Sequence, residues 1–266
     1  MTRKLKHATP AARAAHRQNQ AERKALEERE NDTIVRRVLE TATGLSEQDF
    51  DVVVIPSGYA DISELADERI QKYAEHLRKM ISGAHDSADE STTQANRKRR
   101  QLVEKNETRF AAEPGLRDIT NRMCGMCKGG CCAAGGNAAY ITSATIKRQK
   151  KRQPGLSDED IVQAYLSRLS VQTITNACVN QTTTGCALPT EMRSDTCNGF
   201  HCDTINAWHD RPREERANTV LAIQRSGTYW KRNDLTQPRQ VVEVALVKAE
   251  ALVPLTVNVQ ARPKSS

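Results

Sequence analysis

Apolar residues in the first 113 positions recur mainly at helical spacing. Residues 1–41 are rich in Ala, Glu and Arg with few apolar positions, which predicts a solvated helix. From Asp61 onward the apolar residues recur every three or four positions and predict a helix with one packed face. They are Ile62, Leu65, Ile70, Tyr73, Leu77, Met80 and Ile81. A further apolar face over 102–110 ends before Pro114, and we expect an antiparallel helical hairpin.

Two regions carry a pattern typical of strands. The run "VVVI" at 52–55, followed by Pro56, predicts a short strand or an apolar connector. In the tail, "TVLAIQRSGTYW" places Ser226 and Gly227 as a turn, and "QVVEVALVKAEALV" alternates in part. This predicts a short C-terminal β-hairpin, with a helix as the competing interpretation of the second run. The expected fold is mainly α, with an N-terminal helical region and a small cysteine-rich domain with irregular loops.

Helix signals also occur between 140 and 170. Ser143 is a candidate N-cap of a short helix that Pro154 and Gly155 end. Ser157 and Asp160 have the spacing of a capping box, which predicts the start of another helix. Its expected packed face consists of Ile161, Val162, Tyr165, Leu166 and Leu169.

Composition limits the classes of function. Hydrophobic residues make up 38%, aromatic residues 4%, and mean hydropathy is −0.66, which favours long solvated helices beside a smaller folded unit. The net charge of +7 permits acidic partners. The basic runs 97–100 and 147–152 lack aromatic companions, so we interpret them as solvated helix faces and expect no nucleic-acid binding. No apolar run could cross a bilayer and no secretory signal is evident, so we expect a cytoplasmic protein without membrane contact.

All eight cysteines lie between 124 and 202. We therefore expect three segments, a charged helical region 1–113, a cysteine-cluster metal-binding domain 114–210, and a C-terminal extension 211–266. In a reducing compartment such thiols are metal ligands or redox groups more often than disulfides. Two residues between Cys124 and Cys127 let both sulfurs reach one ion, and the nearby glycines suit the tight turn required.

The spacing leaves the arrangement of the thiols open. Cys131 and Cys132 are adjacent and cannot easily point at one ion, and eight cysteines allow either two four-ligand sites or one site with spare thiols. We interpret Cys202 as a buried spare thiol. His201 and His209 stand nearby as nitrogen donors, and we interpret both as surface or supporting groups rather than ligands.

The motifs "CGMCKGGCC", "YITSATIKR", "CVNQTTTGCALP" and "RSDTCNGF" together resemble the YkgJ-type zinc- or iron-chelating cysteine-cluster family over residues 120–205. The resemblance implies metal chelation, with Arg193 four positions before Cys197 as in the family. Because the shared cysteines come from both halves of the domain, we expect one centre. Its predicted ligands are Cys124, Cys127, Cys131, Cys132, Cys178, Cys186 and Cys197.

Three functions follow as hypotheses. The first is a metal-binding protein that holds zinc or an iron-sulfur cluster. The second is an iron-sulfur enzyme, because the flagellin lysine N-methylases carry a related cluster; Arg193, His201 and Asp203 are the polar groups that could serve it. The third is a zinc-scaffolded adaptor for nucleic acid or protein, with the N-terminal helices as the surface for a protein partner.

Overall fold

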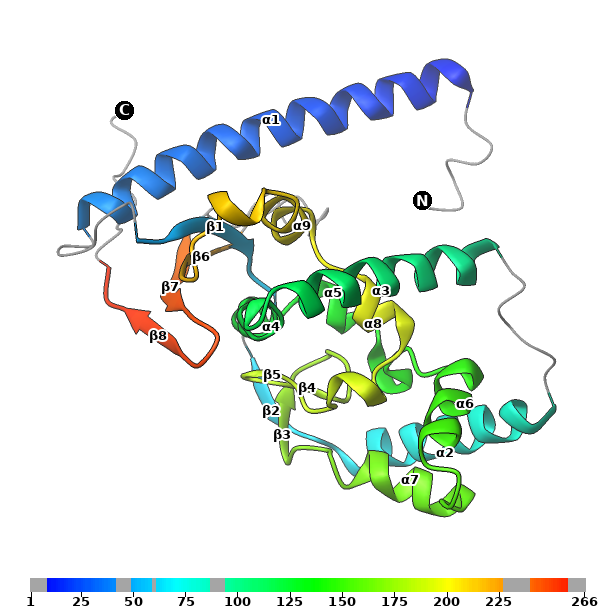
Figure 1. The fold of residues 1–266 in the computed structure, drawn as a ribbon. Coiled ribbons are helices and arrows are strands. Elements are labelled where there is room, and N and C mark those ends of the chain that lie inside the picture. Colours follow the sequence, from blue (N-terminus) through cyan, green and yellow to red (C-terminus); the bar gives the residue numbers. More distant parts are fainter. Residues whose placement is uncertain (1–8, 42–48, 59–60, 87–93, 227–239, 258–266) are drawn as a thin grey trace.

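The computed structural model describes residues 9–41, 49–58, 61–86, 94–226 and 240–257. The protein is mainly helical with some β structure (Figure 1). The α-helices are α1 (Pro10–Thr41), α2 (Asp67–Asp86), α3 (Gln94–Ala112), α4 (Leu116–Cys127), α5 (Gly130–Ala133), α6 (Ser143–Arg152), α7 (Asp158–Leu166), α8 (Asp195–Gly199) and α9 (Asp203–His209). Short 3-10 turns are η3 (Gly136–Ala138), η4 (Thr190–Met192) and η5 (Arg213–Glu215).

The main sheet has four strands in the order β1-β6-β7-β8. These are β1 (Asp51–Pro56), β6 (Val220–Arg225), β7 (Val241–Val247) and β8 (Leu252–Leu255). Strand β1 runs parallel to β6, and the other neighbours are antiparallel. The run at 52–55 is therefore a strand, not a connector. The two C-terminal runs pair as the antiparallel strands β6 and β7, so the competing helix is wrong. Strand β7 begins only at Val241, so the predicted turn of Ser226 and Gly227 does not join these strands directly, and Gly227 lies outside the described residues.

Strand β6 is buried along its whole length because both faces of the sheet are covered. Its alternate residues point to opposite faces, as a strand requires. Leu221 and Ile223 pack with Ile34 and Val38 of α1 on one face. Val220 and Ala222 belong to the cluster on the other face, which includes Met123 of α4 and Trp208 of α9. The sheet thus supports α4, the helix that carries the first cysteines.

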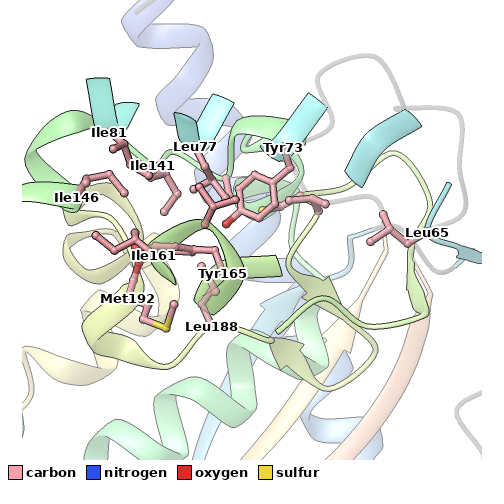
Figure 2. Close-up of a cluster of buried hydrophobic side chains, with 14 residues drawn as sticks. Leu65, Tyr73, Leu77, Ile81, Ile141, Ile146, Ile161, Tyr165, Leu188 and Met192 are labelled. Carbon is pink, nitrogen blue, oxygen red and sulfur yellow. Dashed lines mark hydrogen bonds between the residues drawn. The ribbon is translucent and has the colours of Figure 1, made fainter. Parts of the chain in front are cut away.

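A separate helical core lies between α2, α6 and α7 (Figure 2). Tyr73 and Leu77 of α2 face Ile146 of α6 and Tyr165 of α7, and all four side chains are fully buried. Helix α3 packs instead against α8. The expected antiparallel hairpin of these two N-terminal helices is therefore wrong, because each buries its apolar face against a later part of the chain.

The structure confirms one predicted helix start and corrects two others. The capping box of Ser157 and Asp160 is confirmed at α7. Helix α6 is capped by Thr142, in a capping box with Thr145, so Ser143 is its first residue and not its cap. Helix α2 begins at Asp67, because residues 62–64 form β2 (Ile62–Glu64) and pair with β3 (Gln172–Ile174).

The three expected segments contact one another. β1 from the first segment pairs with β6 from the last, and α2 packs on helices of the cysteine segment. The buried carboxylate of Asp51 strengthens the first of these connections: it accepts hydrogen bonds from Trp208 Nε1 at 2.8 Å, Arg211 Nη1 at 2.6 Å and the Ala217 amide at 3.0 Å. Among the helices that the structure describes, none has the length and apolar character needed to span a membrane.

Candidate metal centre

The cysteines reach the site from separate elements. Cys124 and Cys127 lie on α4, and Cys131 and Cys132 on α5. Cys178 precedes β4 (Gln181–Thr182), Cys186 ends β5 (Gly185–Cys186), Cys197 lies on α8, and Cys202 is the N-cap residue of α9. All eight belong to the described part of the chain, where none forms a disulfide.

One cavity of about 580 Å³ brings most of these thiols together. The cysteines in its lining are Cys124, Cys131, Cys132, Cys178, Cys186 and Cys197. Tyr140, Arg193 and His201 line it as well. Six of the seven predicted ligands therefore share one cavity although up to 73 positions separate them, from 124 to 197. The seventh, Cys127, is buried behind it against the sheet.

The turn after α4 is held tightly against the sheet. Lys128 ends the helix in the left-handed conformation, with φ at 50°. The Gly58 amide donates a hydrogen bond of 2.7 Å to the carbonyl of Cys127. A Cβ on Gly58 would stand 1.9 Å from the carbonyl oxygen of Lys128, so only glycine fits there. The end of β1 thereby fixes the position of Cys127.

A second close approach brings Cys186 near α4. Gly125 faces the turn between β4 and β5, where a Cβ would lie 2.3 Å from the carbonyl oxygen of Thr184. Gly185 has φ at 133°, which is accessible to glycine and rarely to other residues. These two glycines let the β4–β5 hairpin pack against the helix that carries Cys124.

Arg193 is the cation of the cavity lining with the clearest effect on the thiols. Its Nε donates to the Leu188 carbonyl at 2.8 Å and its Nη1 to Asn121 Oδ1 at 3.1 Å, which fix the guanidinium. Burial raises the pKa of Cys124 and of Cys197, and the charge of Arg193 opposes both shifts. Arg193 therefore favours thiolates at two separate positions.

Most of the thiols are held neutral by their surroundings. Burial raises the pKa of Cys127 and Cys202, and it raises the pKa of Cys178 to about 12. The adjacent pair is different, because Cys131 and Cys132 share a hydrogen bond. That bond lowers the pKa of Cys131 and raises that of Cys132. Deprotonation of the buried thiols thus requires a compensating positive charge, which a metal ion supplies.

The donor set fits a thiolate-bound metal in chemistry and number, though its side chains are not arranged as a finished site. Within the described residues, no three Cys, His, Asp or Glu side chains are grouped so that they could hold one ion as they stand. The eight unpaired thiols are soft donors suited to zinc or an iron-sulfur cluster. Binding would then include rotation of cysteine side chains towards the metal.

The two histidines have different positions. His201 lines the cavity, and burial together with Arg109 lowers its pKa to about 4. His209 is buried behind it, with its Nε2 at 2.8 Å from Thr120 Oγ1. Cys202, which the sequence predicts to be a spare thiol, is not in the cavity lining and packs against the same hydrophobic cluster as Cys124 and Cys127.

The fold and the site together describe a mainly helical α/β protein with a cysteine-lined cavity between a mixed sheet and a helical core. Comparison with models of protein families, with curated proteins and with solved structures finds no match.

Proposed function

We propose that this is a metal-binding protein whose cysteine-lined cavity holds zinc or an iron-sulfur cluster. The observation that carries the proposal is the convergence of thiols from α4, α5, β5 and α8 on one cavity. A dense group of unpaired cysteines is unfavourable unless the thiols bind a ligand. Free thiols oxidise, and a buried thiolate is unstable without a positive charge beside it. The resemblance to the YkgJ-type family points in the same direction.

The environment of the thiols also supports this proposal. Buried neutral thiols behave as small hydrophobic side chains, and this would account for Cys127 and Cys178. It does not account for Cys186, which is exposed, or for a fixed guanidinium in the same cavity lining as Cys124 and Cys197. We propose a cytoplasmic location on the same grounds, since a reducing compartment keeps such thiols unpaired.

Purification without oxygen, followed by elemental analysis and an ultraviolet-visible spectrum, tests the proposal. Stoichiometric zinc without colour would identify a closed thiolate site, whereas iron with matching sulfide and broad absorption in the visible range would identify an iron-sulfur protein. A protein that contains neither, and takes up neither after treatment with zinc or with iron and sulfide, would contradict the proposal.

A second candidate function is an iron-sulfur enzyme, and the size of the cavity favours it. At about 580 Å³ the cavity is in the range of small-molecule sites and far larger than a metal ion needs. The buried side chains Asn180 and Gln181 line it, and the oxygens Asn180 Oδ1 and Gln181 Oε1 have no hydrogen-bond partner. If the protein holds such a cluster, cyanide added to the reduced protein should change its electron paramagnetic resonance spectrum, and an unchanged spectrum would argue against an open iron.

An adaptor for nucleic acid is not favoured by the surroundings of the basic run at 147–152. Lys150 pairs with Asp158 and Arg148 pairs with Asp195 at 2.9 Å, while Arg152 donates to the carbonyl of Glu191. These three basic side chains therefore make contacts within the protein.

We also propose that the exposed first half of α1 binds a protein partner.

A further inference from the structure

The basic run at 97–100 borders a second cavity, which the proposed metal-binding function does not use. Its volume is about 410 Å³, within the range of small-molecule sites. It lies between the first half of α3 and the starts of α6 and α8, and we call it the α3 cavity. It is next to the cysteine cavity, since Thr196 lines both. From α3 its lining includes Asn96, Arg97, Arg99, Arg100, Gln101 and Glu104.

Contacts among the three helices hold the walls of the α3 cavity in place (Figure 1). Helix α3 packs on α8, and a Cβ on Gly199 would stand 3.3 Å from the carbonyl oxygen of Arg99. The backbone of α3 therefore touches α8 at the basic run itself. Arg148 of α6 forms an ion pair of 2.9 Å with Asp195 of α8, which joins the other two walls. The arginines of α3 are thus carried by a backbone that is fixed relative to α6 and α8.

The α3 cavity has an excess of positive charge. Two carboxylates, Glu104 and Asp195, lie in its lining together with the three arginines. Asp195 is paired with Arg148, so among the described lining residues Glu104 is the one acidic group left to offset the arginines. The side chains of Arg99 and Arg100 are exposed, and neither forms an ion pair with a residue in the described part of the chain. Their charge is therefore available to an anionic ligand.

The chemistry of the lining favours phosphate groups. A guanidinium presents a planar fork of donors that matches the oxygens of a phosphate, and it stays charged at every physiological pH. Because each phosphate monoester carries about two negative charges at neutral pH, several arginines suit a ligand with more than one phosphate. The described lining of the α3 cavity holds no aromatic ring on which a nucleobase could stack.

We propose that the α3 cavity binds a small organic molecule that carries two or more phosphate groups, with Arg99 and Arg100 as the residues that contact them. This binding site goes beyond the metal-binding function and does not depend on it. It replaces the interpretation of the run at 97–100 as a solvated helix face. The interpretation of the run at 147–152 is unchanged, because its basic side chains are engaged within the protein.

Isothermal titration calorimetry with fructose 1,6-bisphosphate tests the site, and unphosphorylated fructose is the control ligand. The full-length protein is used as purified without oxygen, in about 0.15 M salt, where weak attraction between distant charges is screened. Wild type should bind the bisphosphate and not fructose. Arg99→Gln combined with Arg100→Gln should weaken binding about tenfold or more, since two charge-assisted hydrogen bonds are lost. Glu104→Gln should strengthen binding, because it removes a negative charge from the lining.

Arg36→Gln combined with Arg37→Gln is the matched control. It removes the same charge from two adjacent exposed arginines of α1, so affinity should stay within about twofold of wild type, or about 0.4 kcal/mol. Equal losses in the two double variants would overturn the proposal, as would weaker binding in Glu104→Gln or no binding in wild type. Metal content should be the same in wild type and in both double variants, whether or not the protein holds a metal.

Random-sequence duplex DNA separates the two sources of phosphate. If wild type binds the bisphosphate and DNA does not displace it, the α3 cavity is a site for a small ligand. If wild type binds DNA through Arg99 and Arg100 but does not bind the bisphosphate, these arginines belong to a nucleic-acid surface and the proposal is wrong.

Discussion

Arg193 carries its positive charge in the same cavity lining as Cys124 and Cys197, two thiols whose pKa burial raises and that charge lowers. Arg193→Gln keeps a hydrogen-bond donor but removes the charge. We expect zinc affinity to fall about tenfold, because losing one nearby cation costs about 1.4 kcal/mol of thiolate stabilisation in a partly buried site. Competition with a chelator of known affinity measures this.

Arg122→Gln is the matched control for that change. Arg122 lines the same cavity, but its guanidinium donates to the carbonyls of Ala249 and Glu250. Its replacement should leave zinc affinity within about twofold of wild type, a difference of about 0.4 kcal/mol. An equal loss in both variants would show that the charge of the cavity as a whole matters and not the position of Arg193.

His209 links stability to pH. Burial lowers its pKa to about 3, well below the value of 6.5 expected in an unfolded chain. The charged and titratable groups around it are His201, Arg109 and Arg216, which lower its pKa further, and Asp210, which raises it. Between pH 6.5 and about 3 the unfolded state binds more protons than the native state, so stability falls as pH falls through this window.

His209→Phe should weaken that acid dependence. Phenylalanine keeps an aromatic ring beside Phe110 and Trp208 but takes up no proton. The urea concentration at the unfolding midpoint should decrease less between pH 7.5 and pH 5 in the variant than in wild type. A decrease as large as that of wild type would show that other groups cause the acid dependence, and His201 would be the next residue to replace.

At the scale of elements, the contact of α4 with the β4–β5 hairpin leaves no room for an added side chain. Gly125→Ala would force a Cβ against the carbonyl of Thr184, to which it would stand at 2.3 Å. Overpacking of this kind costs about 1–3 kcal/mol. We expect a lower melting temperature and a lower metal content, because Cys186 moves with the hairpin.

Gly130→Ala serves as the control, since a Cβ at Gly130 would meet nothing within 4 Å. It adds the same methyl group at the first residue of α5, where alanine is the better helix former by about 1 kcal/mol. Stability should stay equal or rise. Loss of metal in Gly130→Ala as well would show that the metal content is sensitive to any added methyl group near the cysteines, and not to the contact of Gly125 with Thr184.

Elements with local signals were predictable from sequence. The capping box of Ser157 and Asp160 needs only residues three apart, and α7 starts there. Thr142 and Ser143 are neighbouring hydroxyl residues, so the cap of α6 was missed by one position. The partners of α2 and α3 were not predictable, because an apolar face such as that of Tyr73 and Leu77 does not specify what covers it.

The same distinction applies to the candidate site. The density of cysteines at 124–132 and their spacing indicate metal ligands without any structure. Which thiols share the cavity depends on how distant segments pack, and Cys202 lies outside its lining because α9 turns that residue towards the cluster under the sheet. Sequence spacing could therefore point to candidate donors but could not show which of them lie together.

Asp51 matters for the whole molecule, because it ties the first strand of the sheet to α9 and to the loop before β6. Asp51→Asn keeps the shape but removes the charge that Trp208, Arg211 and the Ala217 amide share. We expect a loss of about 2 kcal/mol in the free energy of unfolding, typical of hydrogen bonds to a buried charge. Metal content at neutral pH should not change.

Asp210→Asn is the control at an exposed position. Asp210 also pairs with two cations, Lys105 at 3.1 Å and Arg109 at 2.6 Å, but its carboxylate is half exposed. Such pairs contribute about 0–1 kcal/mol. If urea titrations show the same loss in the free energy of unfolding for both variants, the burial of Asp51 does not explain its contribution to stability.

The parallel pairing of β1 with β6 sets an order of events during synthesis. A ribosome makes β1 early, and its hydrogen-bonding partner emerges only after every cysteine has been translated. Closing so long a loop is slow and costs entropy, so nascent β1 has to wait. The thiols meanwhile leave the ribosome without the sheet that later supports α4. Metal delivered before translation ends would meet a more open set of ligands than metal delivered afterwards.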